Sequence, residues 1–413
     1  MIYRFGQLFD IIDGDRGKNY PTDNDFSDEG YCLFLNAGNV TKTGWSFERN
    51  SFISREKDEQ LRKGRVRKGN TVLTTRGTVG NAAFYDDRVP FEHLRINSGM
   101  VILSAKDKGV IENEFIYYLV TSPIAKKTIE LFCSGSAQPQ LPIKDFVKIK
   151  FDLPSIEKQR RTIARLSAYN NLIEANNKRI KVLEQMAENL YKEWFVRFRF
   201  PGHENTEFEN GLPKGWRRGR ISEFYTTSSG GTPSREHDKY YDNGTIHWIK
   251  TGELQDCLLI DTEERITEVA VKKSSAKFFP KDSVLMAMYG VNIGMLAYST
   301  MDATCNQACC VFRDKGSINT KHFLFQCLKS IRDYLLLISF GAAQQNLSQD
   351  LIKRVRIVMP DVETVIRFEQ KIEPLYNEIK HLLKANACLI RQRDLLLPRL
   401  MSGKLEVQYA LND

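Results

Sequence analysis

The stretch that organises this chain runs from residue 154 to residue 200 and reads PSIEKQRRTIARLSAYNNLIEANNKRIKVLEQMAENLYKEWFVRFRF. After Pro154 it contains no glycine or proline, Ser155 stands where a helix N-cap belongs, and Glu157 places negative charge in the first turn. Apolar side chains recur mostly three or four residues apart, at Leu166, Tyr169, Ile173, Ile180, Leu183, Ala187, Leu190 and Trp194. This heptad spacing predicts one long helix with an apolar stripe. At about 1.5 Å per residue the helix is roughly 60 Å long, which is too long to be wrapped by one ordinary domain.

A second copy of this pattern closes the chain 206 residues later. The segment 360–363, Pro-Asp-Val-Glu, repeats the start of the first helix, and the apolar stripe recurs at Ile372, Leu375, Ile379, Leu382, Leu389, Leu396 and Leu400. The similarity extends upstream, since Gly30, Gly38 and Gly80 match Gly244, Gly252 and Gly294, and residues 136–141 match 342–347. We therefore predict an internal repeat in which each half is a globular part followed by a long helix.

Short strand-like segments punctuated by glycine fill both globular parts. In the first part we expect strands over 31–35, 71–75, 100–103 and 147–151, a turn over 76–80 and a helix over 113–122. In the second part we expect strands over 246–250, 283–288 and 309–312 and a helix near 322–329. The predicted fold class is therefore α+β, with the segments 1–153 (first globular part), 154–200 (first helix), 201–215 (linker), 216–359 (second globular part) and 360–413 (second helix and tail).

Composition favours an ordinary protein of two or more domains with a polyanionic partner. The 413 residues are 42% hydrophobic and 27% charged, with a net charge of +9. Basic charge on the two predicted helices can equally be a solvated helix face. No run of 18 apolar residues exists, so we expect no membrane span and a cytoplasmic protein. The eight cysteines are expected to be free, with Cys309 and Cys310 in a buried strand, and the lack of a C-x-x-C pair argues against zinc.

The sequence lacks the common catalytic constellations. The six histidines are scattered, and neither a phosphate-binding loop, a G-x-G-x-x-G turn nor an amino-methyltransferase signature occurs. Asp361 and Glu363 could be mistaken for a nuclease metal site, but the first copy has serine in place of the aspartate, which favours a helix cap. We therefore expect no catalytic residues, no metal and no cofactor, and rank binding above catalysis.

The whole chain resembles the specificity subunit of a type I restriction-modification enzyme. The motifs that carry the resemblance are Leu-Pro-Ser-Ile-Glu-Lys-Gln at 153–159, Leu-Glu-x-Met-x-x-x-Leu-Tyr-x-x-Trp-Phe at 183–195, Leu-Pro-x-Gly-Trp at 212–216 and Leu-Met-Ser-Gly-Lys-Leu at 400–405. The resemblance implies that each globular part is a target recognition domain reading one half of a split double-stranded DNA site. It also implies that the two helices form an antiparallel coiled coil, on which two methyltransferase subunits dock and which restriction (translocase-nuclease) subunits join. Methyl donor, ATP and magnesium would belong to those partners.

Antiparallel pairing predicts one register. The facing apolar pairs are Leu166 with Leu396, Ile173 with Leu389, Ile180 with Leu382, Leu183 with Ile379, Leu190 with Ile372, and Trp194 with Phe368. In that register Asn176 faces Asn386, where a buried amide pair specifies alignment at some cost in stability.

Candidate DNA-binding side chains lie at the glycine-rich turns and their surroundings. We expect contacts to base edges or phosphates from Lys42, Lys68, Arg76, Gln138, Gln140, Lys250, Arg265, Asn292, Gln344, Gln345 and Asn346. For each of them the alternative is a turn residue that satisfies its own backbone, and the glutamine-rich segments at 138 and 344 can equally be helix-to-strand connections. The turn 289–294 lacks the arginine of 76–80 and is one residue longer, so the two half-sites are expected to differ.

Apolar residues left uncovered by a two-helix rod are candidates for partner binding. They are Leu172, Met186, Tyr191, Leu383, Ile390 and Leu397. An alternative function is a noncatalytic coiled-coil adaptor whose two lobes bind protein.

Overall fold

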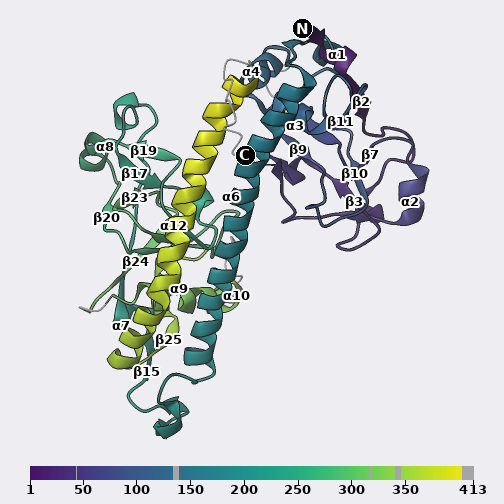
Figure 1. Cartoon of the computed structure of the whole chain (residues 1–413). Coiled ribbons are helices and arrows are strands. Elements are labelled where there is room, and N and C mark those ends of the chain that lie inside the picture. The colour runs from purple at the N-terminus through teal and green to yellow at the C-terminus, as the bar shows by residue number, and fades with distance from the viewer. Residues whose placement is uncertain (43, 134–138, 317–318, 340–345, 402–413) are drawn as a thin grey trace, which may run out of the picture. The chain divides into compact units, whose positions relative to one another are not determined.

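The computed structural model describes residues 1–42, 44–133, 139–316, 319–339 and 346–401 (Figure 1). Contacts divide the chain into two compact units, Met1–Ile173 with Cys388–Asp413 and Glu174–Ala387. Each unit combines one globular part with segments of both long helices, because each helix is shared between the units.

The two predicted long helices are present. The first is α6 (Ile156–Tyr191), which continues as a π-helical turn, η3 (Lys192–Val196), and the second is α12 (Val362–Met401). Asp361 caps α12, since its Oδ1 accepts the Thr364 N–H at 2.9 Å and its Oδ2 accepts the indole N–H of Trp216 at 2.9 Å. The cap interpretation of this segment is confirmed.

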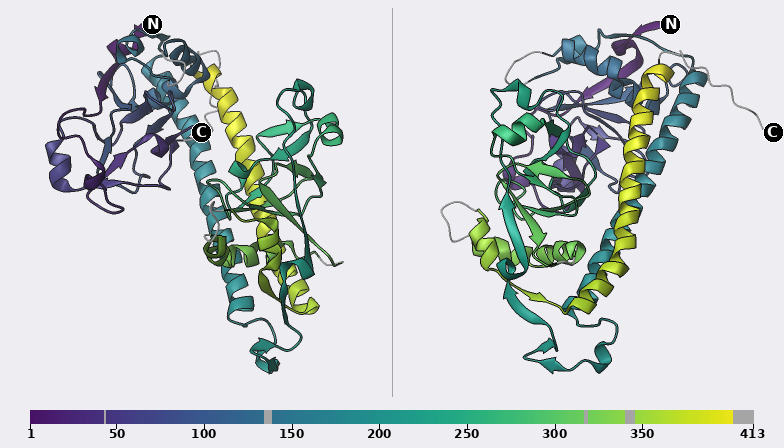
Figure 2. Two further views of the ribbon diagram at one scale, coloured as in Figure 1. Left: turned by 180° about the vertical axis from the view of Figure 1, so that it is seen from behind. Right: turned by 90° about the vertical axis from the view of Figure 1, so that its left-hand side faces the viewer.

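The helices α6 and α12 run side by side and antiparallel in all views (Figures 1 and 2). In the first unit Leu166 belongs to the same buried cluster as Leu397 and Leu400, with Leu396 packed against it. In the second unit the rings of Trp194 and Phe368 lie 5.7 Å apart, and Asn176 bonds to Asn386. The predicted antiparallel coiled coil is therefore confirmed, and its register is confirmed at the tryptophan–phenylalanine and asparagine pairs.

The first unit contains two four-stranded sheets. One has the order β2 (Phe9–Asp13), β11 (Met100–Ala105), β8 (Thr71–Thr74), β9 (Ala82–Phe84), and the other β6 (Phe52–Ile53), β3 (Cys32–Leu35), β10 (Leu94–Ile96), β7 (Arg65–Val66). Only the central pair β3 and β10 is parallel among these strands. A short pair, β1 (Ile2–Arg4) with β12 (Lys150–Asp152), and the helices α3 (Asn113–Thr121) and α4 (Pro123–Leu131) complete the frame.

The second unit repeats this topology. Its sheets have the orders β16 (Tyr225–Ser229), β24 (Cys309–Asp314), β21 (Val284–Ala287), β22 (Leu296–Ser299), β18 (Cys257–Leu259), and β19 (Glu264–Ile266), β17 (Ile246–Ile249), β23 (Ala303–Cys305), β20 (Phe278–Phe279). The pair β17 and β23 is parallel, like β3 and β10, while β18 is an added parallel edge. The pair β15 (Arg217–Arg220) with β25 (Arg356–Met359) and the helices α9 (Lys321–Ser330) and α10 (Arg332–Ser339) take the places of β1, β12, α3 and α4. The internal repeat is confirmed by sheet order.

Smaller elements connect these frames. They are α1 (Phe5–Leu8), η1 (Asp23–Asp25), η2 (Ala37–Asn39), β4 (Val40–Thr41), β5 (Gly44–Trp45), α2 (Arg55–Gln60), α5 (Ile143–Phe146), η4 (His203–Asn205), β13 (Phe208–Glu209), β14 (Leu212–Pro213), α7 (Ile221–Phe224), η5 (Asp238–Tyr240), η6 (Thr251–Glu253), α8 (Glu268–Lys273) and α11 (Gln349–Arg354).

The central strands of both units are buried on both faces. Along β11, Val101 and Leu103 belong to the core shared with α3, while Ile102 belongs to the core shared with the other sheet. Along β24, Cys310 belongs to the core shared with α9, while Cys309 belongs to the core shared with the other sheet. The expectation of buried, free strand thiols is thus confirmed at these two cysteines.

Candidate nucleic-acid interface

An exposed turn of the first unit joins β8 to β9. Its start is fixed by the N–H groups of Thr75 and Arg76, which both donate to the carbonyl of Gly99 at 2.8 and 3.2 Å. Its end is fixed by Gly80, whose N–H donates to Thr74 O at 3.0 Å. Arg76 also forms an isolated antiparallel bridge with Gln140, so two predicted DNA-binding residues come together beside this turn. The Arg76 side chain is exposed and Gln140 is half-buried.

The second unit builds the same turn between β21 and β22. The Met288 N–H donates to Ala308 O at 2.8 Å, and the Gly294 N–H donates to Ala287 O at 2.8 Å. Leu347 N–H donates to Met288 O at 2.7 Å, as Leu141 N–H donates to Thr75 O at 2.9 Å in the first unit. Asn346 therefore takes the place of Gln140, since each directly precedes the leucine that bonds to the start of the turn.

Each turn contains two glycines with positive φ, where a side chain would be strained. They are Gly77 (+72°) and Gly80 (+88°) in the first unit, and Gly290 (+89°) and Gly294 (+78°) in the second. The second turn exposes 37% of Tyr289 and 88% of Val291. Val291 is absent from the predicted site, although an apolar residue directly after a turn glycine was a signal that could have found it.

Amide side chains tie both turns to a neighbouring segment. Asn81 Nδ2 donates to Val40 O at 3.2 Å, and Asn292 Nδ2 donates to Thr251 O at 3.1 Å and Leu254 O at 3.2 Å. Asn292, predicted as a DNA contact, thus directs its amide donors at backbone carbonyls. Its observed role is to hold the turn, which agrees with the alternative of a residue that satisfies the local backbone.

Several of the predicted cations are engaged in ion pairs. Lys68 pairs with Asp87 at 2.5 Å, Arg265 pairs with Asp261 at 3.0 Å, and Lys250 pairs with two carboxylates, Glu263 and Glu264. The hydrogen bonds that Lys250 Nζ donates to these two glutamates raise the pKa of Lys250. The pairs at Lys68 and Arg265 are exposed, so they contribute little stability.

The other predicted DNA-binding residues lie in two different settings. Lys42 is exposed beside the β4–β5 hairpin, two residues after Val40, and lines a cavity together with Tyr117 and Leu397. Gln138, Gln344 and Gln345 lie outside the described residues.

The predicted partner-binding residues differ in exposure. Leu172 and Met186 are 49% and 50% exposed, while Leu383 and Ile390 are half-buried. The expectation that Tyr191 and Leu397 are uncovered is wrong, because each is 6% exposed. The rod is not bare at these points, since helices of the globular parts pack on it.

Tyr191 and Leu397, 206 residues apart, occupy equivalent places and each lines a cavity. The cavity at Tyr191 measures about 440 Å³, and its lining includes Glu188, Lys192 and Lys329. The cavity at Leu397 measures about 230 Å³, and its lining includes Lys126, Arg393 and Asp394. Both are charged hollows between a globular part and the long helix that contributes the tyrosine or leucine.

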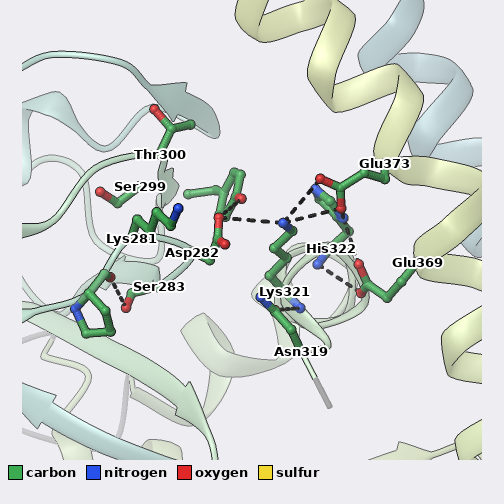
Figure 3. A network of polar contacts seen from close by, with 12 residues as sticks. Lys281, Asp282, Ser283, Ser299, Thr300, Asn319, Lys321, His322, Glu369 and Glu373 are labelled. Carbon is green, nitrogen blue, oxygen red and sulfur yellow. Dashed lines mark hydrogen bonds and ion pairs between the residues drawn. The ribbon is translucent and has the colours of Figure 1, made fainter. Parts of the chain in front are cut away.

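One group of side chains in the described residues has the composition of a metal site. His322, Glu369 and Glu373 hold their donor atoms within 4.8 Å of one another. Glu369 already accepts the N–H groups of His322 (3.1 Å) and Phe323 (2.9 Å) and bonds to His322 Nδ1 at 2.7 Å. Figure 3 shows Lys321 between Glu373 and Asp282, with its ammonium 3.3 and 3.5 Å from their carboxylates. These contacts between His322 and Phe323 of α9 and Glu369 of α12 dock the two helices, while Nε2 of His322 is buried without a hydrogen-bond partner among the described residues.

The first unit docks α3 on α6 through a related network. Tyr118 OH accepts from Asn170 Nδ2 at 3.2 Å, whereas in the second unit Tyr376 OH accepts from Gln326 Nε2 at 3.0 Å. In the first unit the tyrosine lies on α3 and the amide on the long helix α6. In the second unit the amide lies on α9 and the tyrosine on the long helix α12.

Comparison with known proteins agrees with this architecture. A family model described as "Type I restriction modification DNA specificity domain" matches residues 1–185 and 213–384. The chain is 28% identical over 356 residues to the type I restriction enzyme MjaIX specificity subunit of Methanocaldococcus jannaschii, covering 83% of this chain and 78% of that protein. It is 21% identical to the HindI specificity subunit of Haemophilus influenzae, covering 95% and 98% of the two chains.

A solved structure shares the fold. The crystal structure of the type I restriction-modification S subunit from M. genitalium aligns with a TM-score of 0.55 at 14% identity, covering 97% of this chain and 95% of that one. Within the described part of the chain, no helix combines the length and hydrophobicity that a membrane span requires.

Proposed function

Because the chain belongs to the type I restriction-modification DNA specificity family and is a specificity subunit, we propose that it reads an asymmetric, two-part DNA target with one recognition domain per half-site. The recognition domains are residues 1–153 and 216–359. We further propose that it acts in the cytoplasm as a non-catalytic subunit that directs methyltransferase and restriction subunits to the target.

One observation carries this proposal. Both domains build a glycine-containing turn with corresponding backbone hydrogen bonds at its start, at its end and to the following leucine, yet they expose different side chains on it. The first domain presents Arg76 beside Gln140, and the second presents Tyr289 and Val291 beside Asn346. Arginine suits guanine and an amide suits adenine in the major groove, whereas an apolar group suits a thymine methyl. Two equivalent scaffolds with different reading groups favour two different half-sites.

Docking of two methyltransferase subunits is supported by the repeat. Leu172 and Met186 leave apolar surface exposed on α6, and equivalent charged cavities lie at Tyr191 and Leu397. We expect Met186→Asp to weaken assembly with the cognate methyltransferase, with Gln185→Asp, an exposed neighbour, as the matched control. Equal assembly of both variants would contradict docking at this face.

The decisive experiment maps methylation on random DNA by the complex of this chain with its methyltransferase. We expect two specified half-sites separated by an unread spacer. Replacing residues 1–153 with the corresponding domain of another family member is expected to change one half-site and keep the other. A swap that leaves both half-sites intact would overturn the assignment of one domain to each half.

A noncatalytic adaptor with two protein-binding lobes is the alternative function. DNA binding by the complex distinguishes the two, because contacts to phosphates make affinity fall steeply with salt concentration. Affinity that is absent, or insensitive to salt, would favour the adaptor.

A further inference from the structure

Arg332, the first residue of α10, forms a three-way clamp inside the second unit. Its Nη1 donates to Asp256 Oδ2 at 2.7 Å, its Nη2 donates to Asp256 Oδ1, and its Nε donates to the carbonyl of Gly294 at 2.9 Å. The two side chains are 17% and 21% exposed. The planar guanidinium suits this arrangement, since it places several donors in a rigid fork that an ammonium cannot reproduce.

The clamp holds the point where the exposed turn enters β22. Asp256 Oδ1 also accepts the Leu296 N–H at 3.1 Å, so the carboxylate and the guanidinium together fix both Gly294 and Leu296. Asp256 itself has a left-handed backbone, with φ of +57°, which the surrounding bonds maintain. A Cβ on Gly294 would lie 3.3 Å from Arg332 Cγ, so the glycine also makes room for the clamp.

The turn is held from two further directions. Leu347 N–H fixes its start at Met288 O, and Asn292 ties its middle to the segment 251–254. Despite this, Val291 leaves 88% of its surface exposed. A turn of this length that is fixed at its start, middle and end presents its exposed side chains in one geometry, which is the condition for selective binding.

The first domain fixes its shorter turn differently. The atom nearest to a Cβ on Gly80 is Cγ2 of Ile129, at 3.9 Å, whereas the atom nearest to a Cβ on Gly294 is Cγ of Arg332, at 3.3 Å. The additional residue of the second turn thus coincides with a charged clamp at its end.

We propose that Arg332, held by Asp256, is a positioning residue that sets base discrimination at the second half-site by fixing the turn that carries Tyr289 and Val291. This rests on the proposed function, and it adds residues that touch no base. No signal in the sequence indicated them, because Arg332 lies 76 residues from Asp256 and 38 from Gly294.

The test uses the complex with the cognate methyltransferase, after its target has been mapped. Dissociation constants are measured for the target duplex, for a duplex altered in the first half-site and for one altered in the second. Discrimination is the ratio of the dissociation constants for the altered duplex and the target duplex. We expect Arg332→Met to reduce this ratio roughly tenfold at the second half-site, which is within the range that one mismatched base pair costs, and to leave it unchanged at the first. Arg332→Lys is expected to restore part of the loss, and Lys214→Met, which breaks an exposed pair with Glu207, to change neither.

The two half-sites act as internal controls for each other. If Arg332→Met fails to assemble, Asp256→Asn removes the charge with little change of shape and is read in the same way. Variants that keep wild-type discrimination at the second half-site, or lose discrimination equally at both, would overturn the positioning role. A wild-type complex without any two-part target would instead overturn the proposed function.

Discussion

Asn176 Nδ2 donates to Asn386 Oδ1 across the two long helices at 2.8 Å, and both side chains are buried. Asn386 Nδ2 in turn donates to Asn177 Oδ1 at 2.8 Å. The neighbouring layer is apolar, formed by Ile180 and Leu382. In the 206-residue repeat, Asn176 corresponds to Leu382 and Ile180 corresponds to Asn386. Each repeat position is therefore asparagine in one helix and apolar in the other. Only one alignment pairs amide with amide and apolar with apolar.

The asparagine layer is expected to specify register at the expense of stability. Asn176→Leu leaves Asn386 Oδ1 without that donor and is expected to lower the free energy of unfolding by about 1–3 kcal/mol. The double variant with Asn386→Leu is expected to recover most of this loss. Chemical denaturation of the three proteins checks the order, with the exposed Asn377→Leu as control. A double variant less stable than both single variants would contradict the argument.

A glycine of the second domain marks a close passage of two backbone segments. A Cβ at Gly230 would lie 1.8 Å from the carbonyl oxygen of Cys305, whereas a Cβ at Gly252 meets nothing within 4 Å. We expect Gly230→Ala to destabilise the protein by about 3 kcal/mol or more and Gly252→Ala by about 0.5 kcal/mol or less. Thermal unfolding of the two variants is the measurement, and equal midpoints would refute the close contact.

The cap of α12 is expected to weaken in acid. Burial raises the pKa of Asp361, but hydrogen bonds from Thr364 and Trp216 outweigh it and hold this pKa below the ordinary value of 3.8. A depressed carboxyl pKa contributes stability that is complete above the unfolded value and is lost as pH falls through the folded value. We expect Asp361→Ala to cost about 1–2 kcal/mol at pH 7, and this difference from wild type to shrink below about pH 4. Denaturation series at both pH values test this, and a difference that grows in acid would contradict it.

Val291 is expected to sense a thymine methyl group in the second half-site. Uracil lacks only that methyl, so replacing the contacted thymine by uracil should remove about 0.8 kcal/mol, or about fourfold in affinity. Val291→Ala is expected to bind both duplexes with similar affinity, and uracil in the first half-site serves as the control. Wild-type affinity unchanged by uracil at every thymine of the second half-site would exclude this contact.

The features that depend on local periodicity could be predicted from the amino-acid sequence. Heptad spacing and helix-capping residues predicted both long helices, the Asn176–Asn386 meeting and the repeat, because a regular stripe has one geometric solution. Glycine spacing likewise located the two turns, since positive φ at Gly80 and Gly294 is a property of the residue and its neighbours.

Which partners those residues meet depends on the three-dimensional packing of distant segments. The turn position of Asn292 predicts a DNA contact, yet its amide donates to carbonyls 38 to 41 residues away. The helical pattern predicts that Tyr191 and Leu397 are exposed on the rod, but packing against the globular parts buries them. The Arg332–Asp256 clamp likewise joins residues far apart in the chain. Hydrogen bonds and burial depend on contacts between distant segments, and no local pattern encodes which segments the fold brings together.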